Sequence, residues 1–569
     1  MKNNKLDYIS FHTSNIHRII KGLALDKKKI YFLLPIYYSL TFINAIIEGV
    51  SILLLVTIAS QISAGINLNT IELPKYAIQI MNMLGLKIDI QNSIYFLTVL
   101  FSFNLFTRVI LLIFDGLFSA ILRRKLQETL FSKFLFGQWS VTRNFRLGDA
   151  IGTNTQEAIT VAKYLCSAIS GFYYAFSALV MILMAIATSP KIMVSLVLIG
   201  FPFIIIMKNI FSIQGRLSKK SALLRNQFSA DIADRFNGLL QVHVDNNYEY
   251  HIKRGVRTQK ILTKLDIELG FCQALIGSFN VLLLLFVMIS FSFWLYFIGI
   301  ESIQGLSAIG GVSILSFRAA SQLNGAVASF GNLSRLSGSL FPVLSLLAIA
   351  PINKRTLIQE EIIAIKLNRV SYKYGIHNVL NNINLRVIKG SPLLLTGRSG
   401  NGKTTIGNLI AGLFYPSSGE LMYEGASGKS YLSSKYRANI GFVTQDIYLF
   451  QGTLRSNLIG NRKCTDNEIW SALKQVDIFN FVKKIGGLDT PTAEAGRSLS
   501  GGQRRRLGIA RALLSGCDIL IFDEILSGLD TINKIAITQL INKLSASNII
   551  IMISHDEILL NNQVKFNLN

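Results

Sequence analysis

The chain has 569 residues, of which 50% are hydrophobic and only 16% are charged, and its formal net charge is +25. Soluble domains carry about 25% charged residues, so the composition excludes an ordinary soluble protein and predicts membrane-embedded segments. The Lys and Arg residues are spread along the chain and are not interleaved with aromatic residues, so no nucleic-acid partner is expected.

The first part of the chain contains several long apolar stretches. A spanning helix needs about 20 mostly apolar residues, and six stretches qualify: approximately 31–60, 93–122, 164–188, 191–213, 268–298 and 304–328. Basic residues gather in 123–163 and 214–267, which indicates cytosolic helical extensions of the spans. The sequence therefore predicts a cytosolic basic segment over residues 1–30 and a six-helix transmembrane domain over 31–349.

Charged residues inside the predicted spans each cost about 2.5–3.5 kcal/mol and are functional candidates, among them Glu48, Arg108, Asp115 and Arg318. Glu48 and Arg108 differ in depth by only about 6 Å when counted from the cytosolic flanks, so an ion pair between them is expected. Asp115 lies on the same span as Arg108. Arg318 has no partner on its own helix and is expected to face a central cavity, where it suits an anionic cargo. The candidate substrate residues are Arg318, Glu48 and Arg108.

The chain changes character at Ala350–Pro351, and residues 350–569 resemble a soluble α/β domain. Short β-branched runs alternate there with helical patterns, which is typical of a largely parallel sheet. These runs are Ile362–Ile365, Leu393–Thr396, Ile519–Phe522 and Ile549–Ile553.

A glycine-rich run follows the apolar residues Leu393–Leu395. Its glycines let backbone amides turn inward around phosphate oxygens, and a following helix N-terminus adds positive potential. Lys403 can reach the β and γ phosphates, and Thr404 offers a hydroxyl to Mg²⁺. The sequence predicts an ATP-binding P-loop made of Gly397, Arg398, Ser399, Gly400, Asn401, Gly402, Lys403, Thr404 and Thr405.

The apolar run Ile519–Phe522 ends in two carboxylates. Such a strand can deliver Asp523 to a metal ion and Glu524 to the attacking water, as the general base. Two acids at a strand end can also form a solvated turn, but the upstream P-loop favours the catalytic interpretation.

The sequence Leu499-Ser500-Gly501-Gly502-Gln503 precedes a basic helix that begins at Arg504–Arg506. This run resembles the signature of ABC transporter ATPases, and with the P-loop and the acidic strand it identifies residues 350–569 as similar to that family. The resemblance implies an exporter half: a six-span membrane domain fused to one P-loop ABC ATPase domain. It further implies that Ser500, Gly501, Gly502 and Gln503 complete the nucleotide site of a partner subunit.

The resemblance also assigns roles to single positions. Tyr374 is similar to the aromatic residue that stacks on adenine, with Tyr372 as an alternative. Gln445 resembles the glutamine that senses Mg²⁺ and the membrane domain, and His555 resembles the switch histidine at the γ-phosphate. Glu494 is similar to a residue that contacts the transmembrane helices, and Asp530 to one that links the two sites of a dimer.

Two positions depart from the family pattern. Asp556 stands where an arginine commonly follows the switch histidine, and the chain ends at Asn569, before the closing elements that most members carry. A shortened end of the ATPase domain is therefore expected, with no catalytic position affected.

The resemblance predicts a multi-pass protein of the bacterial inner membrane with its ATPase domain in the cytoplasm. It would use ATP and Mg²⁺ and work by alternating access, as a homodimer or with a related half-transporter, in contact with membrane lipids. Short coupling helices are expected near Gln138–Arg146 and Leu240–Asn247.

The stretch Phe317–Asn324 resembles the sixth helix of lipid-linked oligosaccharide flippases, which favours a lipid-linked glycan or another anionic lipid as cargo. A peptide, protein or multidrug exporter stays open, as does an ATP-gated membrane regulator that transports nothing.

Overall fold

The computed structural model divides into two compact units, Met1–Gly137 with Val141–Pro351 and Gln138–Ser140 with Ile352–Asn569. The structure describes residues 18–19, 27–63, 90–145, 147–188, 190–298, 303–352, 354–398, 400–492, 499–527, 529, 531–554 and 560–568.

The first unit is helical. Its long helices are α2 (Lys27–Ser63), α4 (Ile90–Leu135), α7 (Ala158–Thr188), α8 (Pro190–Asn237), α10 (Tyr248–Ile298) and α11 (Ile303–Leu336). Shorter elements join or follow them: α6 (Leu147–Gly152), the π-helix η1 (Thr153–Glu157), α9 (Leu239–Val244), the 3₁₀ turn η2 (Ser337–Ser339) and α12 (Leu340–Leu347). The residues of the short helix α5 (Trp139–Thr142) are divided between the two units.

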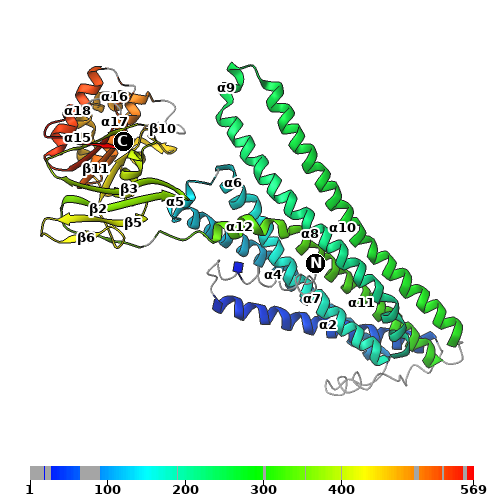
Figure 1. Ribbon diagram of the computed structural model, residues 1–569. Coiled ribbons are helices and arrows are strands. Elements are labelled where there is room, and N and C mark those ends of the chain that lie inside the picture. The colour runs from blue at the N-terminus through cyan, green and yellow to red at the C-terminus, as the bar shows by residue number, and fades with distance from the viewer. Residues whose placement is uncertain are drawn as a thin grey trace. The chain divides into compact units, whose positions relative to one another are not determined.

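Several helices are much longer than a bilayer requires. Helices α4, α8 and α10 have 46, 48 and 51 residues, so each is about 70–75 Å long at 1.5 Å per residue, against a hydrocarbon core of about 30 Å. These helices continue past the predicted spans 93–122, 191–213 and 268–298. Figure 1 shows α8 and α10 running alongside each other, with the short helix α9 at the end where they join.

Three of the described helical segments have the length and composition to cross a membrane, Pro35–Val56, Gln91–Leu135 and Gly148–Ala187. They contain most of the first three predicted spans. The other predicted spans, 191–213, 268–298 and 304–328, lie within α8, α10 and α11.

A buried apolar cluster holds α4 against α7 and α12. Leu122, Leu126 and Leu130 are spaced by four residues, so they share one face of α4, and all three are buried against residues such as Val161 of α7 and Val343 of α12. This periodicity explains why the apolar face of α4 continues beyond the predicted span.

The second unit is built on a five-stranded parallel sheet with the order β13-β4-β12-β11-β8. Its strands are β4 (Leu393–Gly397), β8 (Ile440–Val443), β11 (Ile519–Asp523), β12 (Ile549–Ile553) and β13 (Val564–Leu568). Every residue of β11 and β12 is buried, as expected for strands covered on both faces. Alternate residues belong to two different cores: Leu520 and Phe522 face one cluster, and Ile519 and Ile521 face the other.

A second, antiparallel sheet has the order β3-β2-β5-β6, from β2 (Ile362–Tyr374), β3 (His377–Ile388), β5 (Ser418–Gly425) and β6 (Ser430–Leu432). The run Ile362–Ile365, expected as a strand of a largely parallel domain, lies in this antiparallel sheet. This run begins the 13-residue strand β2, which pairs antiparallel with β3 and β5. Its burial largely alternates along the strand, which is the pattern of a sheet with one covered face.

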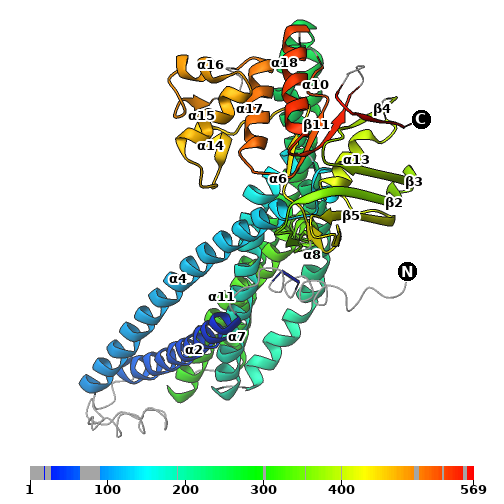
Figure 2. The same cartoon turned by 90° about the vertical axis from the view of Figure 1, so that its left-hand side faces the viewer.

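The helices of this unit are α13 (Lys403–Ile410), α14 (Leu454–Ile459), α15 (Asp466–Gln475), α16 (Phe479–Lys484), α17 (Gly501–Leu513) and α18 (Thr531–Ser545). Short strand pairs complete it: β1 (Thr356–Leu357) with β7 (Tyr436–Arg437), and β9 (Gly452–Thr453) with β10 (Pro491–Thr492). Figure 2 shows α14, α15 and α16 on one side of β11, and α13 with β2 and β3 on the other.

Candidate functional site

The predicted nucleotide-binding residues follow the carboxyl ends of neighbouring parallel strands. Gly397 ends β4 and Asp523 ends β11, while Gln445 comes two residues after β8. Strands β4, β12, β11 and β8 are adjacent and parallel, so these three residues lie at one edge of the sheet. This edge is where open parallel sheets bind their ligands.

The P-loop joins β4 to α13 through left-handed glycines. Gly397, Gly400 and Gly402 have φ angles of 134°, 88° and 93°, which residues with a side chain adopt only with strain. The ammonium group of buried Lys403 donates hydrogen bonds to the carbonyl oxygens of Gly397 at 2.8 Å and Arg398 at 3.0 Å. The loop is therefore already wrapped around a positive charge at the N-terminus of α13, an arrangement that can bind phosphate.

Thr404 and Asp523 converge from the P-loop and the acidic strand. The Thr404 hydroxyl lies 3.5 Å from Oδ1 of Asp523, and burial raises the pKa of Asp523. Hydroxyl and carboxylate oxygens are ligands that Mg²⁺ prefers, so these two side chains fit a magnesium site. In the described part of the chain no cluster of three or more His, Cys, Asp or Glu could hold a metal ion, so such an ion would depend on water and nucleotide phosphates for its other ligands.

Glu524 adopts a strained backbone conformation directly after Asp523. Its φ angle is 51°, which is uncommon for a residue with a side chain and is concentrated at functional sites. Its amide donates to the Ile553 carbonyl at 3.0 Å, and its carbonyl accepts a bond of 2.9 Å from the Ser527 hydroxyl. The backbone is thus held on both sides, and the Glu524 side chain is half-buried.

The two neighbouring tyrosines of β2 have different surroundings. Tyr372 is buried and stacks on Phe414 with ring centroids 5.1 Å apart. Tyr374 is half-buried, and its hydroxyl lies 3.4 Å from the Thr405 hydroxyl on the P-loop helix. Of the two tyrosines, Tyr374 is therefore the one in contact with the P-loop helix.

The signature residues form the N-terminus of α17. The Ser500 hydroxyl accepts a hydrogen bond from the Gln503 amide at 3.2 Å, while the Gln503 side chain accepts one from the Ser500 amide at 2.9 Å. This capping box leaves the amides of Gly501 and Gly502, in the first turn, without a bonding partner inside the helix. Such amides form an anion-binding end.

The signature helix and the P-loop helix pack in different parts of the domain. Helix α17 packs against α14, α15 and β8, whereas α13 packs against β4, β11 and β12. Figure 2 shows them on opposite sides of β11. The structure brings Thr404 of the P-loop to Asp523 and Thr405 to Tyr374. The anion-binding end of α17 belongs to another region of the same domain.

Comparisons with known proteins agree with this architecture. The family model described as "ABC transporter" matches residues 380–527, which include the P-loop, the signature and the acidic strand. The chain carries an ABC transporter ATPase domain. An uncharacterized ABC transporter ATP-binding protein of Bacillus subtilis is 40% identical over 194 residues, which are 34% of this chain and 34% of that protein. An ATP-dependent lipid A-core flippase of Desulfotalea psychrophila is 37% identical over 194 residues, again 34% of both chains.

The whole chain has the fold of an ABC exporter half. A bacterial Atm1-family ABC exporter with ATP bound matches 94% of this chain and 91% of its own chain with a TM-score of 0.74, at 17% sequence identity. The predicted fold class, an N-terminal helical membrane domain followed by an ABC ATPase domain, is therefore confirmed. By sequence, the chain spans about a third of the length of the curated relatives named above.

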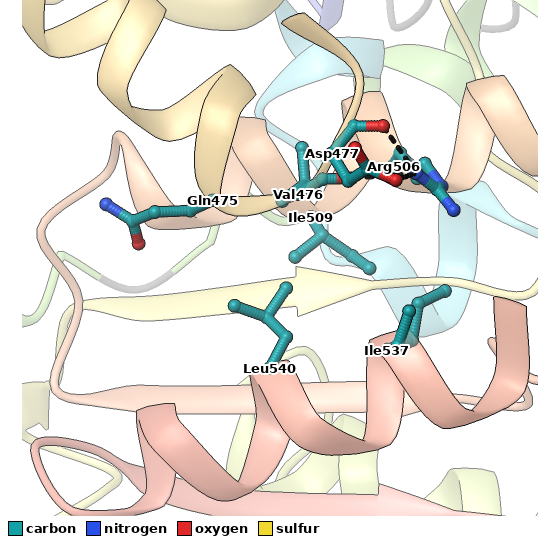
Figure 3. Close-up of a pocket in the computed structure, with 8 residues that line it drawn as sticks. Gln475, Val476, Asp477, Arg506, Ile509, Ile537 and Leu540 are labelled. Atoms are coloured by element: carbon teal, nitrogen blue, oxygen red, sulfur yellow. Dashed lines mark hydrogen bonds and ion pairs between the residues drawn. The ribbon is translucent and has the colours of Figure 1, made fainter.

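A network around Arg506 in the ABC ATPase domain was not predicted from the sequence. Its guanidinium donates to Asp477 Oδ2 at 2.7 Å, to the Val476 carbonyl at 3.4 Å and to the Asp477 carbonyl. It also donates to Asn533 on α18. Figure 3 shows Arg506 and Asp477 beside a small pocket that is also lined by Ile509, Ile537 and Leu540. The basic run Arg504–Arg506 was the available signal, but its partners are distant in sequence.

Several predicted site residues lie outside the described residues of the ABC ATPase domain. They are Ser399, Glu494, Asp530, His555 and Asp556.

The predicted ion pair between Glu48 and Arg108 was wrong. Glu48 of α2 is buried and forms an ion pair with Arg318 of α11. Counting residues from the cytosolic flanks placed Glu48 and Arg108 at similar depths. It gave no information about the rotation of each helix about its axis. Thr107, beside Arg108, donates a hydrogen bond of 2.5 Å to Asn44, and Glu48 one turn further along α2 faces α11. Arg108 itself is exposed.

Proposed function

We propose that the protein is an ATP-driven exporter that works as a dimer, with each ATP bound between the P-loop of one subunit and the signature helix of the other. The observation that carries this proposal is the separation of α13 from α17 within one domain. Each domain has two anion-binding helix ends that belong to different regions, and a head-to-tail pair would bring one of each together around the phosphates.

The residues at the carboxyl edge of the parallel sheet would have different roles in ATP hydrolysis. Lys403 would leave the carbonyl oxygens of Gly397 and Arg398 to bind the β and γ phosphates, because a phosphate is a stronger partner than a neutral carbonyl. Thr404 and Asp523 would hold Mg²⁺, which neutralises phosphate charge when bound. Glu524 would accept the proton of the attacking water. Gln445 and His555 remain proposed partners of the metal and the γ-phosphate, and Asp530 a proposed link between the sites.

The short helices of the membrane unit support transmission of movement from the ATPase domains. Helix α9 joins α8 to α10 and exposes Leu240 at 78% and Val244 at 71%. Exposed apolar side chains at the tip of a helical hairpin indicate a protein interface. We propose that α5 and α9 are the coupling helices that contact ATPase domains, and that the hairpins carry closure of the ATPase pair to the membrane helices.

The proposed cargo class is supported by a charged residue of the second span and by the named relatives. Arg318 no longer supports an anionic cargo, because Glu48 compensates its charge. Arg108 remains an exposed cation in the second span, and relatives named lipid A-core flippases occur in Desulfotalea psychrophila and Haemophilus influenzae. We retain a lipid-linked glycan or another anionic lipid as the proposed cargo, with Arg108 as its contact.

An ATP-gated regulator without transport has less support. A protein that uses ATP binding alone as a switch is expected to lose its catalytic carboxylate or its signature cap. Here Asp523, Glu524 and the capping box of Ser500 and Gln503 are all in place. This combination favours repeated hydrolysis.

The decisive experiment replaces Glu524 with Gln in the full-length protein and measures ATP turnover in lipid nanodiscs. We expect kcat to fall at least about 100-fold, because general base catalysis typically contributes 10²–10⁴-fold, while KM for ATP changes little. Glu420→Gln makes the same chemical change at an exposed position of β5 and should leave kcat unchanged. Normal turnover by Glu524→Gln would show that another group activates the water.

A further inference from the structure

Strand β13 lies against the full length of β4 and reaches the first residue of the P-loop. The two strands are parallel, and their register runs from Val564 opposite Leu393 to Leu568 opposite Gly397. At the other end, the Ser391 hydroxyl donates to the Asn562 carbonyl at 2.8 Å. The P-loop thus begins at the point where β13 ends.

A side chain of the P-loop makes a direct bond to that end of β13. The Asn401 amide group donates a hydrogen bond of 2.9 Å to the carbonyl oxygen of Leu568, which is 167 residues away in the chain. The same carbonyl oxygen fills the space that a Cβ atom on Gly397 would need. Leu568 is buried and Asn401 is half-buried, so this hydrogen bond is partly shielded from solvent.

The orientation of the Asn401 side chain separates its role from that of the loop backbone. The glycines on either side of it, Gly400 and Gly402, have left-handed conformations, which turn successive backbone amides toward one concave face. The Asn401 side chain is directed to β13 instead. It therefore does not serve as a phosphate ligand, although its position in the P-loop suggested a nucleotide contact.

We propose that Asn401 is a positioning residue that anchors the P-loop to the end of β13 and keeps its phosphate-binding face open. This inference rests on the proposed ATP hydrolysis. Without nucleotide, Lys403 also holds the loop through the carbonyls of Gly397 and Arg398. Once Lys403 turns to the phosphates those two bonds are lost, and the bond from Asn401 to Leu568 remains. The anchor should therefore matter most for the ATP-bound loop.

The test compares Asn401→Ala with Ser391→Ala in the full-length protein. Each change removes one side-chain hydrogen bond to a backbone carbonyl at one end of β13, but only Asn401 lies in the P-loop. We expect Asn401→Ala to raise KM for ATP about fivefold, the ratio that matches a hydrogen bond of about 1 kcal/mol, with kcat within about twofold of wild type. Ser391→Ala should leave KM unchanged.

The melting temperature with and without ATP supplies the second readout. Asn401→Ala should reduce the ATP-induced rise in melting temperature, while both variants melt alike without nucleotide. An unchanged KM in Asn401→Ala, or an equal rise in KM in Ser391→Ala, would overturn the inference. If Asn401→Ala does not fold, Asn401→Ser makes the same test, because a serine hydroxyl is too short to reach Leu568. A wild-type protein that binds ATP without hydrolysing it would contradict the proposed function, while the ATP-induced shift would still decide the role of Asn401.

Discussion

At the scale of single residues, chemically similar neighbours acquire different roles from their surroundings. Asp523 is the buried last residue of β11, and burial raises its pKa, whereas Glu524 is half-buried on a left-handed backbone. A bound cation favours the charged form of a carboxylate, so Asp523 suits the metal and Glu524 the water. Tyr372 and Tyr374 differ in the same manner, since only Tyr374 borders the P-loop helix.

Substitutions can distinguish the role of Tyr372 from that of Tyr374. Tyr374→Ala should raise KM for ATP about two- to tenfold, because aromatic stacking contributes about 0.5–1.5 kcal/mol, and Tyr374→Phe should keep the wild-type KM. Tyr372→Ala removes a buried ring and should instead lower stability by about 3–5 kcal/mol. Steady-state ATPase kinetics and thermal melting measure the two effects. A loss in Tyr374→Phe equal to that in Tyr374→Ala would assign the role to the hydroxyl bond with Thr405.

At the scale of elements, Arg506 joins three segments of the ATPase domain. It extends from the signature helix α17 to the link between α15 and α16 and to Asn533 on α18. The Arg506 side chain is 15% exposed, whereas that of Asp477 is 82% exposed. Exposed ion pairs contribute little, while hydrogen bonds from a buried charge contribute about 1.5–3 kcal/mol each. The bonds to the Val476 and Asp477 carbonyls and to Asn533 should therefore dominate.

This distinction predicts unequal effects at the two ends of the ion pair. Arg506→Met should cost about 3 kcal/mol and lower the melting temperature of the ATPase domain by about 6–12 °C. Asp477→Asn keeps a residue that tolerates the left-handed backbone at φ 54° and should cost less than about 1 kcal/mol. Differential scanning fluorimetry of the nucleotide-free protein measures both. Equal losses would mean that the exposed carboxylate holds the network.

At the scale of the whole molecule, an exporter fold places a charged pair within the membrane helices. Glu48 is buried and pairs with Arg318 between the first and sixth predicted spans. Removal of one partner of a buried pair costs about 3–5 kcal/mol, because it leaves an uncompensated charge, while removal of both is often nearly neutral. Each charge should therefore serve mainly to compensate the other within the membrane unit rather than to attract cargo.

A double-mutant cycle tests this pairing. Glu48→Gln and Arg318→Met should each lower the melting temperature of the purified protein, and the double variant should recover most of the loss. Arg108→Met is the matched control, since it removes a cation from a neighbouring span, and its effect should add to that of Glu48→Gln. Coupling of Glu48 to Arg108, with additivity for Arg318, would contradict the structure.

Features that depend on neighbours in sequence were predictable from the sequence alone. The apolar spans, the P-loop that begins α13 and the cap of α17 by Ser500 and Gln503 all arise from composition or from bonds between residues a few positions apart. Such local interactions leave a pattern that a sequence displays directly.

The tertiary structure decided the partners that are distant in sequence. It paired Glu48 with Arg318, placed Ile362–Ile365 in an antiparallel sheet, and brought Asn401 to Leu568. These outcomes depend on the rotation of each helix about its axis and on the order of strands in a sheet. Neither quantity follows from the residues of one segment, because each is set by how the apolar faces of all segments pack together.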